Sequence, residues 1–470
     1  MNVATPVRKR NQEAIDSALG VLRQQFGDRL ITSMAVREQH AHTTTWLPNE
    51  APDGVIFAES TEEVSEIVKV CATYGVPVIP FGTGTSLEGH VNAPYGGISI
   101  DMMKMNAVLE VHPEDLDCVI QPGITRKQLN SYLRDTGLFF PIDPGADASL
   151  GGMCATSASG TNAVRYGTMR DNVMSVKAVM PNGDIVKTAA RAKKTSAGYD
   201  LTRLMVGSEG TLGVITEITL KLYGIPDTIA GGVCSFPDVG SACNATIMTI
   251  QSGIPVARIE LLDTLQVKAA NAYSKLSLPE QPALFLEFHG TEGSVKEQSD
   301  LFASIADEFG GGTFQWATKA EDRTELWQAR HDAYWAALGL RPGAKGVSTD
   351  VCVPISRLAE CVEATMEDID RNNLMAPIVG HVGDGNFHVL ILVDMENPNE
   401  ISEAEAFVER LNWRAIEMEG TCTGEHGIGQ GKMKYLGTEL GLPALSVMGA
   451  VKAAIDPDGI MNPGKVLASS

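Results

Sequence analysis

The sequence predicts an α+β fold made of two domains, and three observations lead to this prediction. Helix-like segments that open on capping residues alternate with short strand-like segments from about residue 50 to residue 225. The break at Gly224-Ile225-Pro226-Asp227 ends that pattern, and longer strands and helices alternate beyond it. Glycine makes up 47 of the 470 residues, a proportion typical of chains with many tight turns or with backbone that lies close to a ligand.

The predicted elements of the first domain follow from capping and turn signals. Ser60-Thr61-Glu62-Glu63 is a capping box and predicts a helix that ends at Gly75, while Thr125 and Gln128 cap a second helix. Asn182-Gly183 indicates a hairpin turn. Apolar or alternating stretches predict strands, the last of them half-buried, at residues 76–79, 98–100, 118–120, 173–179, 185–186 and 214–222.

Beyond the break, strands are expected at residues 256–261 and 283–289, and helices at 294–309 and 359–371. This alternation predicts a mixed or antiparallel sheet covered by helices, in a ferredoxin-like arrangement. We therefore expect a helical segment at the start, two domains, and a C-terminal segment that packs back on the first domain. The expected bounds of these four parts are residues 1–50, 51–225, 226–430 and 431–470.

The balance of charge disfavours nucleic-acid binding. The chain has 37 Lys and Arg against 58 Asp and Glu, a formal net charge of −21, which repels a phosphate backbone. None of the eight cysteines is spaced Cys-x-x-Cys, so an iron–sulfur cluster or a thiolate zinc site is not expected, and the thiols should be reduced. A homodimer is compatible with these features.

The composition also leads to an expected location. No apolar run approaches the ~18 residues needed to cross a bilayer. Arg8-Lys9-Arg10 has no apolar stretch behind it, and Glu13, Asp16 and Asp28 argue against a transit peptide. We therefore expect a cytoplasmic protein, with peripheral attachment to an inner membrane as the alternative.

Three glycine-rich segments stand out in the first domain. The first, residues 81–89, follows a strand directly, and its backbone N–H groups could converge on an anion. It is neither a G-x-G-x-x-G fingerprint nor a P-loop. The second, residues 144–162, has no side chain larger than threonine from Ala155 to Thr161, which lets backbone lie flat against a planar ligand. The third is residues 207–213. Each alone could be an ordinary loop.

A histidine–glutamate constellation lies in the second domain. Gly380-His381-Val382-Gly383-Asp384-Gly385-Asn386-Phe387-His388 is interpreted as strand, four-residue turn and strand, which places His381 directly opposite His388. Glu425 in a Gly-Glu-His-Gly setting is a third candidate ligand. Two His and one Glu form an open divalent site that zinc, manganese and iron all tolerate. A satisfied polar turn is the alternative interpretation.

The glycine-rich segments resemble the flavin-binding domain of the vanillyl-alcohol oxidase (p-cresol methylhydroxylase) family. The resemblance implies a two-part FAD-binding domain with a substrate (cap) domain, the first segment holding the pyrophosphate and the second lining the isoalloxazine. Some members bind FAD covalently through a histidine where this chain has Thr85, so non-covalent FAD is implied. The implied cofactor-binding residues are Pro80, Gly82, Thr83, Gly84, Thr85, Ser86, Gly89, Pro144, Gly145, Ala146, Ser149, Gly152, Ala155, Ser159, Gly160, Glu209, Gly210, Ile215 and Asn462.

From about residue 45 to residue 467 the chain is similar to the FAD-linked D-2-hydroxyacid dehydrogenases. The motifs H-V-G-D-G-N-x-H and G-E-H-G-I-G carry this resemblance, and residues 348–354 are closest to the cytochrome-linked group that oxidises D-lactate. The resemblance implies hydride transfer from C2 of a small D-2-hydroxy acid to flavin N5. It implies a metal on His381, His388 and Glu425, His426 as the base, Arg330 on the substrate carboxylate and Asn386 hydrogen-bonded to the substrate.

Alternatives remain open from the sequence. D-2-hydroxyglutarate or glycolate could replace D-lactate, although Ser348 stands where the hydroxyglutarate enzymes usually have a lysine. A metal-dependent hydrolase without flavin would use the same two His and Glu. A non-enzymatic scaffold protein would use neither the glycine-rich segments nor the histidine–glutamate group. No haem-attachment or cluster motif is present, so the electrons are expected to leave to a separate cytochrome, quinone or electron-transfer flavoprotein.

Overall fold

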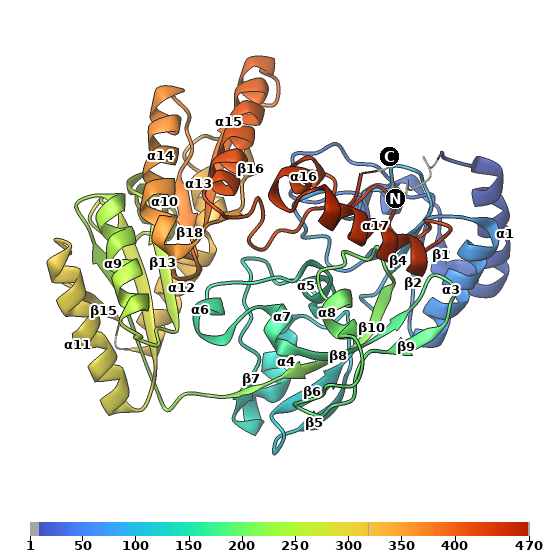
Figure 1. Cartoon of the computed structure of the whole chain (residues 1–470), viewed down its shortest axis with the longest axis horizontal. Helices are drawn as coiled ribbons and strands as arrows, with labels where there is room; N and C mark the ends of the chain where they lie inside the picture. Colours follow the sequence, from blue (N-terminus) through green and yellow to red (C-terminus); the bar gives the residue numbers. More distant parts are fainter. Residues whose placement is uncertain (1–8, 318, 469–470) are drawn as a thin grey trace. The chain divides into compact units, whose positions relative to one another are not determined.

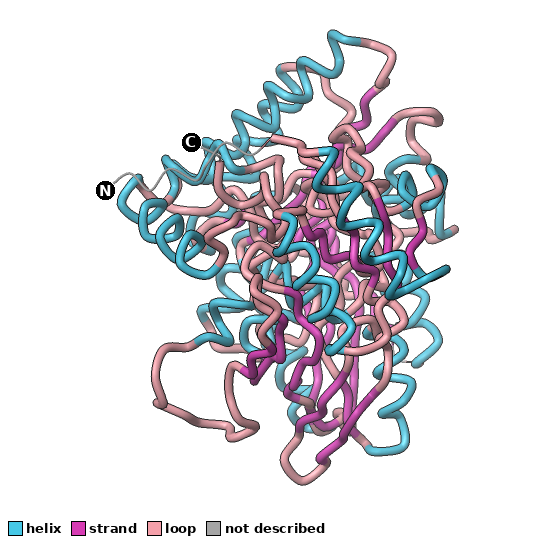
Figure 2. Tube along the Cα trace, turned by 90° about the vertical axis from the view of Figure 1, so that its right-hand side faces the viewer, coloured by secondary structure: helices cyan, strands magenta, loops and turns pink. Residues whose placement is uncertain are grey.

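The computed structural model describes residues 9–317 and 319–468 and divides them into two compact units (Figure 1). The first unit contains the described residues up to 159, residues 168–224 and those from 425 onward, and the second contains residues 160–167 and 225–424. Helices, strands and loops are interleaved along the trace of the chain (Figure 2). The fold is therefore a mix of α and β, as predicted. Expectations that concern residues 1–8 and 469–470 lie outside the described residues.

Two bounds differ from those expected. Residues 425–430 belong to the first unit, and residues 160–167 belong to the second. The 160–167 segment is held there by hydrogen bonds from Arg258 Nε to Asn162 Oδ1 (2.9 Å) and between Tyr166 and His289 (2.8 Å). These contacts join residues about 100 positions apart, so a local pattern of hydrophobicity could not reveal them.

The first unit contains two main sheets. A four-stranded sheet has the order β1-β2-β4-β3, in which β2, β4 and β3 are parallel and β1 is antiparallel to β2. A five-stranded antiparallel sheet has the order β5-β6-β10-β8-β9, and β7 pairs with β11 apart from both. The strands are β1 Leu30–Ile31, β2 Gly54–Phe57, β3 Val78–Phe81, β4 Ile98–Asp101, β5 Val108–His112, β6 Asp117–Ile120, β7 Leu138–Phe139, β8 Val173–Val179, β9 Ile185–Lys187, β10 Val214–Lys221 and β11 Tyr223–Gly224.

Two helices of the first unit, α3 and α4, begin where the sequence predicts them. The Ser60 side chain accepts from Glu63 N at the start of α3, and Gly75 ends that helix with a φ of 65°. Thr125 and Gln128 form a reciprocal capping box at α4. The α-helices are α1 Gln12–Phe26, α2 Met34–Gln39, α3 Thr61–Tyr74, α4 Arg126–Leu133, α5 Leu150–Thr156, α7 Met169–Asn172, α8 Leu201–Met205, α16 Leu436–Glu439 and α17 Leu442–Ile455, with 3-10 turns at Gly27–Arg29, Arg134–Thr136 and Met433–Tyr435.

Strand β10 is more buried than the sequence predicts. Its alternating residues indicate a half-buried strand, but the burial pattern leaves only Glu217 and Lys221 partly exposed. The reason is its position inside the five-stranded sheet, between β6 and β8, where both α3 and α5 contact it. The C-terminal segment also belongs to this unit, since Met461 forms a parallel bridge with Val78.

The second unit is built on one antiparallel sheet with the order β15-β12-β14-β13-β18-β19-β16, and β17 pairs with β19. The first four strands in chain order take the order fourth, first, third, second, which is the ferredoxin-like pattern with an additional helix, α10. The strands are β12 Thr228–Ser235, β13 Arg258–Leu262, β14 Ala283–Gly290, β15 Gln315–Ala317, β16 Lys345–Ser348, β17 Val351–Cys352, β18 Ile378–Gly380 and β19 Asn386–Val393.

Helices cover both faces of this sheet. Phe285 packs with Trp327 of α12, whereas Phe288 packs with Phe302 of α11, and residues 285 and 288 point to opposite faces of β14. Helix α9 contacts α11 and α14, and Figure 1 shows α9 and α11 beside one another. The helices are α6 Ala163–Tyr166, α9 Val239–Gln251, α10 Thr264–Ser274, α11 Glu292–Glu308, α12 Ala320–His331, α13 Ala333–Leu338, α14 Leu358–Arg371 and α15 Pro398–Glu417, with 3-10 turns at Ile355–Arg357 and Val382–Asp384.

Two further findings concern the cysteines and the search for membrane-spanning helices. All eight cysteines lie in the described ranges, and none of them is in a disulfide. Among the described residues, every helix is too short or too polar to span a bilayer.

The capping box at α4 gives a first prediction. Replacing Thr125 with Ala should lower the free energy of unfolding by about 1 kcal/mol, because the N–H of Gln128 loses its acceptor. Urea unfolding followed by circular dichroism measures this change. Thr73→Ala, at an exposed position near the end of α3, is the matched control and should change stability by less than about 0.5 kcal/mol. Equal effects of the two substitutions would contradict the capping role.

Candidate active site

The three glycine-rich segments meet within the first unit. Ser149 N donates to Thr83 Oγ1 at 3.3 Å, and a Cβ on Gly82 would collide with Ser149 Oγ. A Cβ on Gly210 would lie 3.0 Å from Pro80, so the third segment packs against the end of β3. The backbone of the third segment is also tied to α5, because Glu209 N donates to Ala155 O at 2.8 Å. Segments that are far apart in the sequence thus form one cluster.

This cluster has features that fit a dinucleotide cofactor. Ser86 Oγ and Ser208 Oγ are buried and have no hydrogen-bond partner among the described residues. A buried hydroxyl without a partner is costly, so each is suited to donate to a ligand oxygen. A loop rich in glycine and hydroxyl side chains offers the backbone and side-chain donors that a pyrophosphate needs. The residues present therefore fit FAD.

The other predicted cofactor residues lie at varied positions around this cluster. Gly145 and Ala146 form an exposed turn before α5, and Gly152 and Ala155 lie on α5 itself. Ser159 is the last residue of its segment in the first unit, while Gly160 begins the segment that belongs to the second unit. The remaining positions are Gly84, Thr85 and Gly89 in the loop after β3, Pro144 before the exposed turn, and Ile215, which is buried in β10.

The Glu209 carboxylate is occupied by backbone groups. Its Oε1 accepts from Ile428 N at 2.7 Å and its Oε2 accepts from Gly429 N at 2.8 Å, while His90 Nε2 lies 3.1 Å from Oε2. Burial alone would raise the pKa of Glu209, but His90 and the two backbone donors lower it below its ordinary value. Glu209 therefore fixes residues two and three positions after His426.

The Asn462 side chain is likewise hydrogen-bonded to backbone groups of the protein. Its Nδ2 donates to His90 O at 3.1 Å and to Glu209 O at 2.8 Å. Asn462 therefore ties the C-terminal segment to the third glycine-rich segment.

In the second unit, one carboxylate joins two predicted site residues. Glu260 on β13 accepts from Arg330 of α12 through Nε at 2.9 Å and Nη2 at 2.5 Å, and its other oxygen lies 2.8 Å from His381 Nδ1. All three side chains are buried. A carboxylate on Nδ1 fixes the histidine tautomer and leaves Nε2 as the nitrogen that can bind a metal.

A second carboxylate, Asp350, organises the other half of the constellation. Asn386 Nδ2 donates to Asp350 Oδ1 and to Val351 O, both at 2.8 Å, and Thr423 Oγ1 donates to Asp350 Oδ2 at 2.9 Å. Both contacts of Asn386 are made by its amide nitrogen. Asn386 thus also fixes Asp350.

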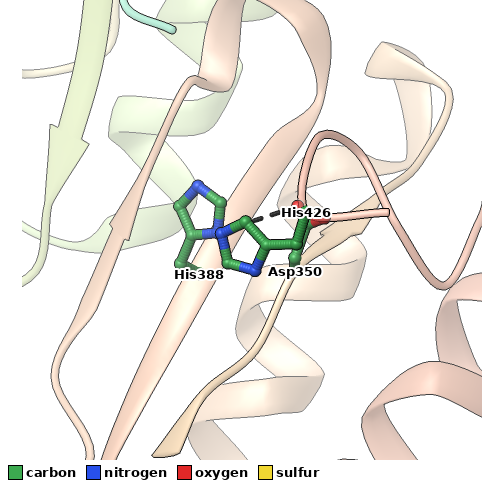
Figure 3. A group of neighbouring side chains, drawn as sticks. All are labelled: Asp350, His388 and His426. Carbon is green, nitrogen blue, oxygen red and sulfur yellow. Dashed lines mark ion pairs between the residues drawn. The ribbon is translucent and has the colours of Figure 1, made fainter. Parts of the chain in front are cut away.

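His388 lies beside Asp350 and is held by the backbone (Figure 3). Its Nδ1 is 3.0 Å from Thr349 O, which can only accept, and 3.7 Å from Asp350 Oδ1. This contact favours the tautomer with the proton on Nδ1, in which Nε2 is the nitrogen suited to bind a metal, as in His381. The imidazole rings of His381 and His388 are nearly perpendicular, with centroids 5.4 Å apart.

The predicted pairing of His381 with His388 is wrong. In the structure His388 pairs with Val379, and His381 lies outside β18 at the start of a 3-10 turn. This turn closes through a hydrogen bond from Asp384 N to His381 O, and Gly385 follows it with a φ of 79°. The turn takes up more residues than a four-residue hairpin loop and shifts the register by two. The rings nevertheless meet, because the turn brings His381 back toward β19.

Glu425 and His426 directly follow Gly424, the last residue of the second unit. One potential ligand atom from each of His381, His388 and Glu425 lies within 4.8 Å of the others, and the same holds for Asp350, His388 and His426. Both groups contain donors suited to a divalent metal. The residues present therefore fit such an ion, with the three ligands that the sequence indicates.

Sequence reasoning missed Glu260 and Asp350. Each is a charged residue within or beside a buried strand, and Glu260 stands in the otherwise apolar run Ile259-Glu260-Leu261-Leu262. A single acid in a buried strand must have partners, and this signal could have marked both residues.

Comparison with known proteins defines the class. Residues 52–189 match a family described as an FAD binding domain, and residues 225–466 match the C-terminal domain of FAD linked oxidases. The chain belongs to this family of FAD-linked oxidoreductases. The hydrolase and scaffold alternatives are thereby set aside, because the family binds a redox cofactor.

Two relatives and one solved structure show in more detail which proteins the chain is similar to. The chain is 52% identical to "Probable D-lactate dehydrogenase, mitochondrial" of Danio rerio, covering 97% of this chain and 92% of the relative. It is 51% identical to "D-lactate dehydrogenase [cytochrome], mitochondrial" of Arabidopsis thaliana, covering 88% and 73%. Substrate-bound p-cresol methylhydroxylase has the same fold, with a TM-score of 0.79 at 16% identity over 98% of both chains.

These relatives correct the expected location. The prediction of a cytoplasmic protein is wrong, because both relatives are named as mitochondrial. A compartment is set by targeting segments that receptors read, whereas an acidic surface and reduced thiols suit several compartments. The amino-acid composition therefore could not indicate the compartment of this protein.

The Glu209 contacts give a second prediction. Glu209→Gln should lower the free energy of unfolding at pH 7 by about 1–3 kcal/mol, because an amide has only one acceptor for two backbone donors. The folded-state pKa is depressed, so this stabilisation is present above the unfolded pKa and is lost as the pH falls through the folded pKa. The difference from wild type should therefore shrink below pH ~4.

Urea unfolding of both proteins at pH 7 and at acidic pH measures this dependence. Glu66→Gln, at an exposed position of α3, is the control and should show a small difference at both pH values. A Glu209→Gln difference that does not change with pH would contradict the assigned ionic role.

Proposed function

We propose that this protein is an FAD-dependent dehydrogenase that oxidises D-lactate to pyruvate. The observation that carries the proposal is the buried group of Arg330, Glu260, His381 and His388, in which one carboxylate contacts both Arg330 and His381 and the rings of His381 and His388 lie 5.4 Å apart. The names of the relatives with about half their residues identical support D-lactate as the substrate.

FAD, bound non-covalently, supplies the two-electron acceptor that takes the hydride from C2 of the substrate. The loop after β3 would hold the pyrophosphate through its backbone N–H groups and the Ser86 hydroxyl. The small side chains around Ala155 would let the chain lie against the isoalloxazine. Thr85 offers no imidazole for a covalent link.

The substrate would be held at two points. Arg330 is engaged with Glu260 through Nε and Nη2, so its Nη1 side can face the substrate carboxylate. His381, His388 and Glu425 would bind a divalent ion, which supplies Lewis-acid polarisation of the substrate hydroxyl. Zinc, manganese and iron all suit these ligands.

His426 would take the hydroxyl proton on an imidazole nitrogen while the hydride leaves C2. The hydride would carry both electrons to the flavin and the proton would pass to the ring, so the alcohol becomes a ketone with no reactant beyond the substrate and the cofactor. The electrons then pass to an external acceptor. We propose a cytochrome for this role, as the name of the Arabidopsis relative specifies for that protein.

Substrate-dependent bleaching of the flavin tests the proposal. Anaerobic mixing of the purified holoprotein with D-lactate should bleach the flavin band near ~450 nm, and L-lactate should leave it unchanged, because Arg330 and the metal fix which face of C2 is presented. D-2-hydroxyglutarate and glycolate are measured in parallel. Faster bleaching by either would replace D-lactate as the substrate, and bleaching by none of the acids would reject the proposed function.

Removing the base should separate chemistry from cofactor binding. His426→Ala should slow flavin reduction by D-lactate about 10²–10⁴-fold while FAD stays bound, because the variant lacks the imidazole that takes the hydroxyl proton. Stopped-flow absorbance measures the rate, and the absorption of the purified variant measures the FAD content. Reduction at the wild-type rate would discard His426 as the base.

Removing a ligand should lower metal content and activity together. His388→Ala should bind less metal, as measured by elemental analysis after dialysis, and should turn over D-lactate correspondingly more slowly. His112→Ala removes a partly exposed imidazole of the first unit and is the matched control. Undiminished turnover of the wild-type protein after exhaustive chelation would remove the metal from the mechanism.

A further inference from the structure

Glu260 occupies a position where a carboxylate is costly unless it has partners. It lies in the middle of β13, is 1% exposed, and has Ile259 and Leu261 as its neighbours in the strand. The pairing of Leu261 with Gly380 means that one further step of the ladder would set Glu260 opposite His381. The register of β13 and β18 therefore places the Glu260 carboxylate beside His381, which directly precedes the 3-10 turn Val382–Asp384.

Both oxygens of Glu260 are used, and each serves a different group. Oε1 lies 2.8 Å from His381 Nδ1, and Oε2 accepts from Arg330 Nε at 2.9 Å and Nη2 at 2.5 Å. The acid thus fixes the tautomer of an imidazole through one oxygen and the orientation of a guanidinium through the other.

We propose that Glu260 is a positioning residue that couples metal binding by His381 to substrate binding by Arg330. This inference rests on the proposed function, since it assigns roles to the same site. The Glu260 carboxylate would then orient both groups that hold a 2-hydroxy acid. His381 acts on the hydroxyl side through the metal, and the Arg330 guanidinium acts on the carboxylate side. Loss of this acceptor should weaken both functions together.

The substitution Glu260→Gln exposes the coupling because an amide has one acceptor oxygen and one donor nitrogen. If the oxygen serves Arg330, the amide NH₂ faces His381 Nδ1, and the ring must carry its proton on Nε2, where it can no longer bind a metal. If the oxygen serves His381, the NH₂ faces the donors of Arg330 and displaces the guanidinium. Each orientation breaks one contact outright and weakens the other, because the remaining acceptor is a neutral amide oxygen instead of a charged carboxylate oxygen.

The experiment measures two quantities on the FAD-loaded protein. Titration of the metal-free holoprotein with Zn²⁺ should show about 10–100-fold weaker binding for Glu260→Gln. The KM for D-lactate at saturating Zn²⁺ should rise about 10-fold or more, because the guanidinium that holds the carboxylate has moved. FAD content and circular dichroism should stay as in wild type.

Glu287→Gln is the matched control. Glu287 is 5% exposed, pairs in register with Arg258, and faces the same side of the sheet as Glu260, but its contacts are with His289 Nε2 at 2.7 Å and Arg258 Nε at 3.6 Å. Zn²⁺ affinity in this variant should stay within about 2-fold of wild type, because no proposed ligand loses its partner. An equal loss in both variants would show a general effect of removing a buried charge and would overturn the inference.

Glu260→Asp keeps the charge and tests the geometry if the Gln variant fails to fold. Its shorter side chain cannot reach both partners, so either the Zn²⁺ affinity or the KM should change by about 10-fold. Wild-type values for both quantities in Glu260→Asp or Glu260→Gln would overturn the coupling. Failure of the wild-type protein to bind Zn²⁺ or to oxidise D-lactate would reject the proposed function instead, so the two failures are distinguishable.

Discussion

A buried carboxylate must be surrounded by hydrogen-bond donors, and this requirement shapes the candidate site more than any other interaction. Three acids show it. Glu260 takes its donors from Arg330 and His381, Asp350 takes them from Asn386 and Thr423, and Glu209 takes them from the backbone of Ile428 and Gly429. In each case the donors belong to, or adjoin, the residues proposed for the site. The cost of burying these charges is therefore offset by contacts that also orient those side chains.

The segment that carries Glu425 and His426 illustrates how this works along the chain. Thr423, two residues before Glu425, is bonded to Asp350 in the second unit, and Ile428, two residues after His426, is bonded to Glu209 in the first. Gly427 between them has a φ of 83°, and a Cβ there would lie 2.7 Å from Glu209 Oε1. A larger residue would displace the carboxylate that fixes the segment. Glu425 and His426 thus lie in a short stretch that is fixed at each end.

Much of the fold could be predicted because its signals are local. The capping boxes at Ser60 and Thr125 and the alternation in the strands depend on neighbours in the sequence, and the structure confirms the helices and strands they predict. The pairing of His381 with His388 was wrong because a 3-10 turn replaced the expected loop, and the sequence does not distinguish the two turns. Glu260 was missed because its partners are 70 and 121 residues away. The cofactor segments were located by resemblance, and the roles of single residues there stay predictions.

The central claim is that buried carbonyl and carboxylate groups turn Nε2 of His381 and His388 toward one divalent ion. X-ray absorption at the zinc edge of the Zn²⁺-loaded protein tests this claim most directly, since it reports the atoms that bind the metal. Two imidazole nitrogens together with oxygen donors at about 2.0–2.2 Å are expected. A shell with thiolate sulfur, or one without imidazole, would contradict it.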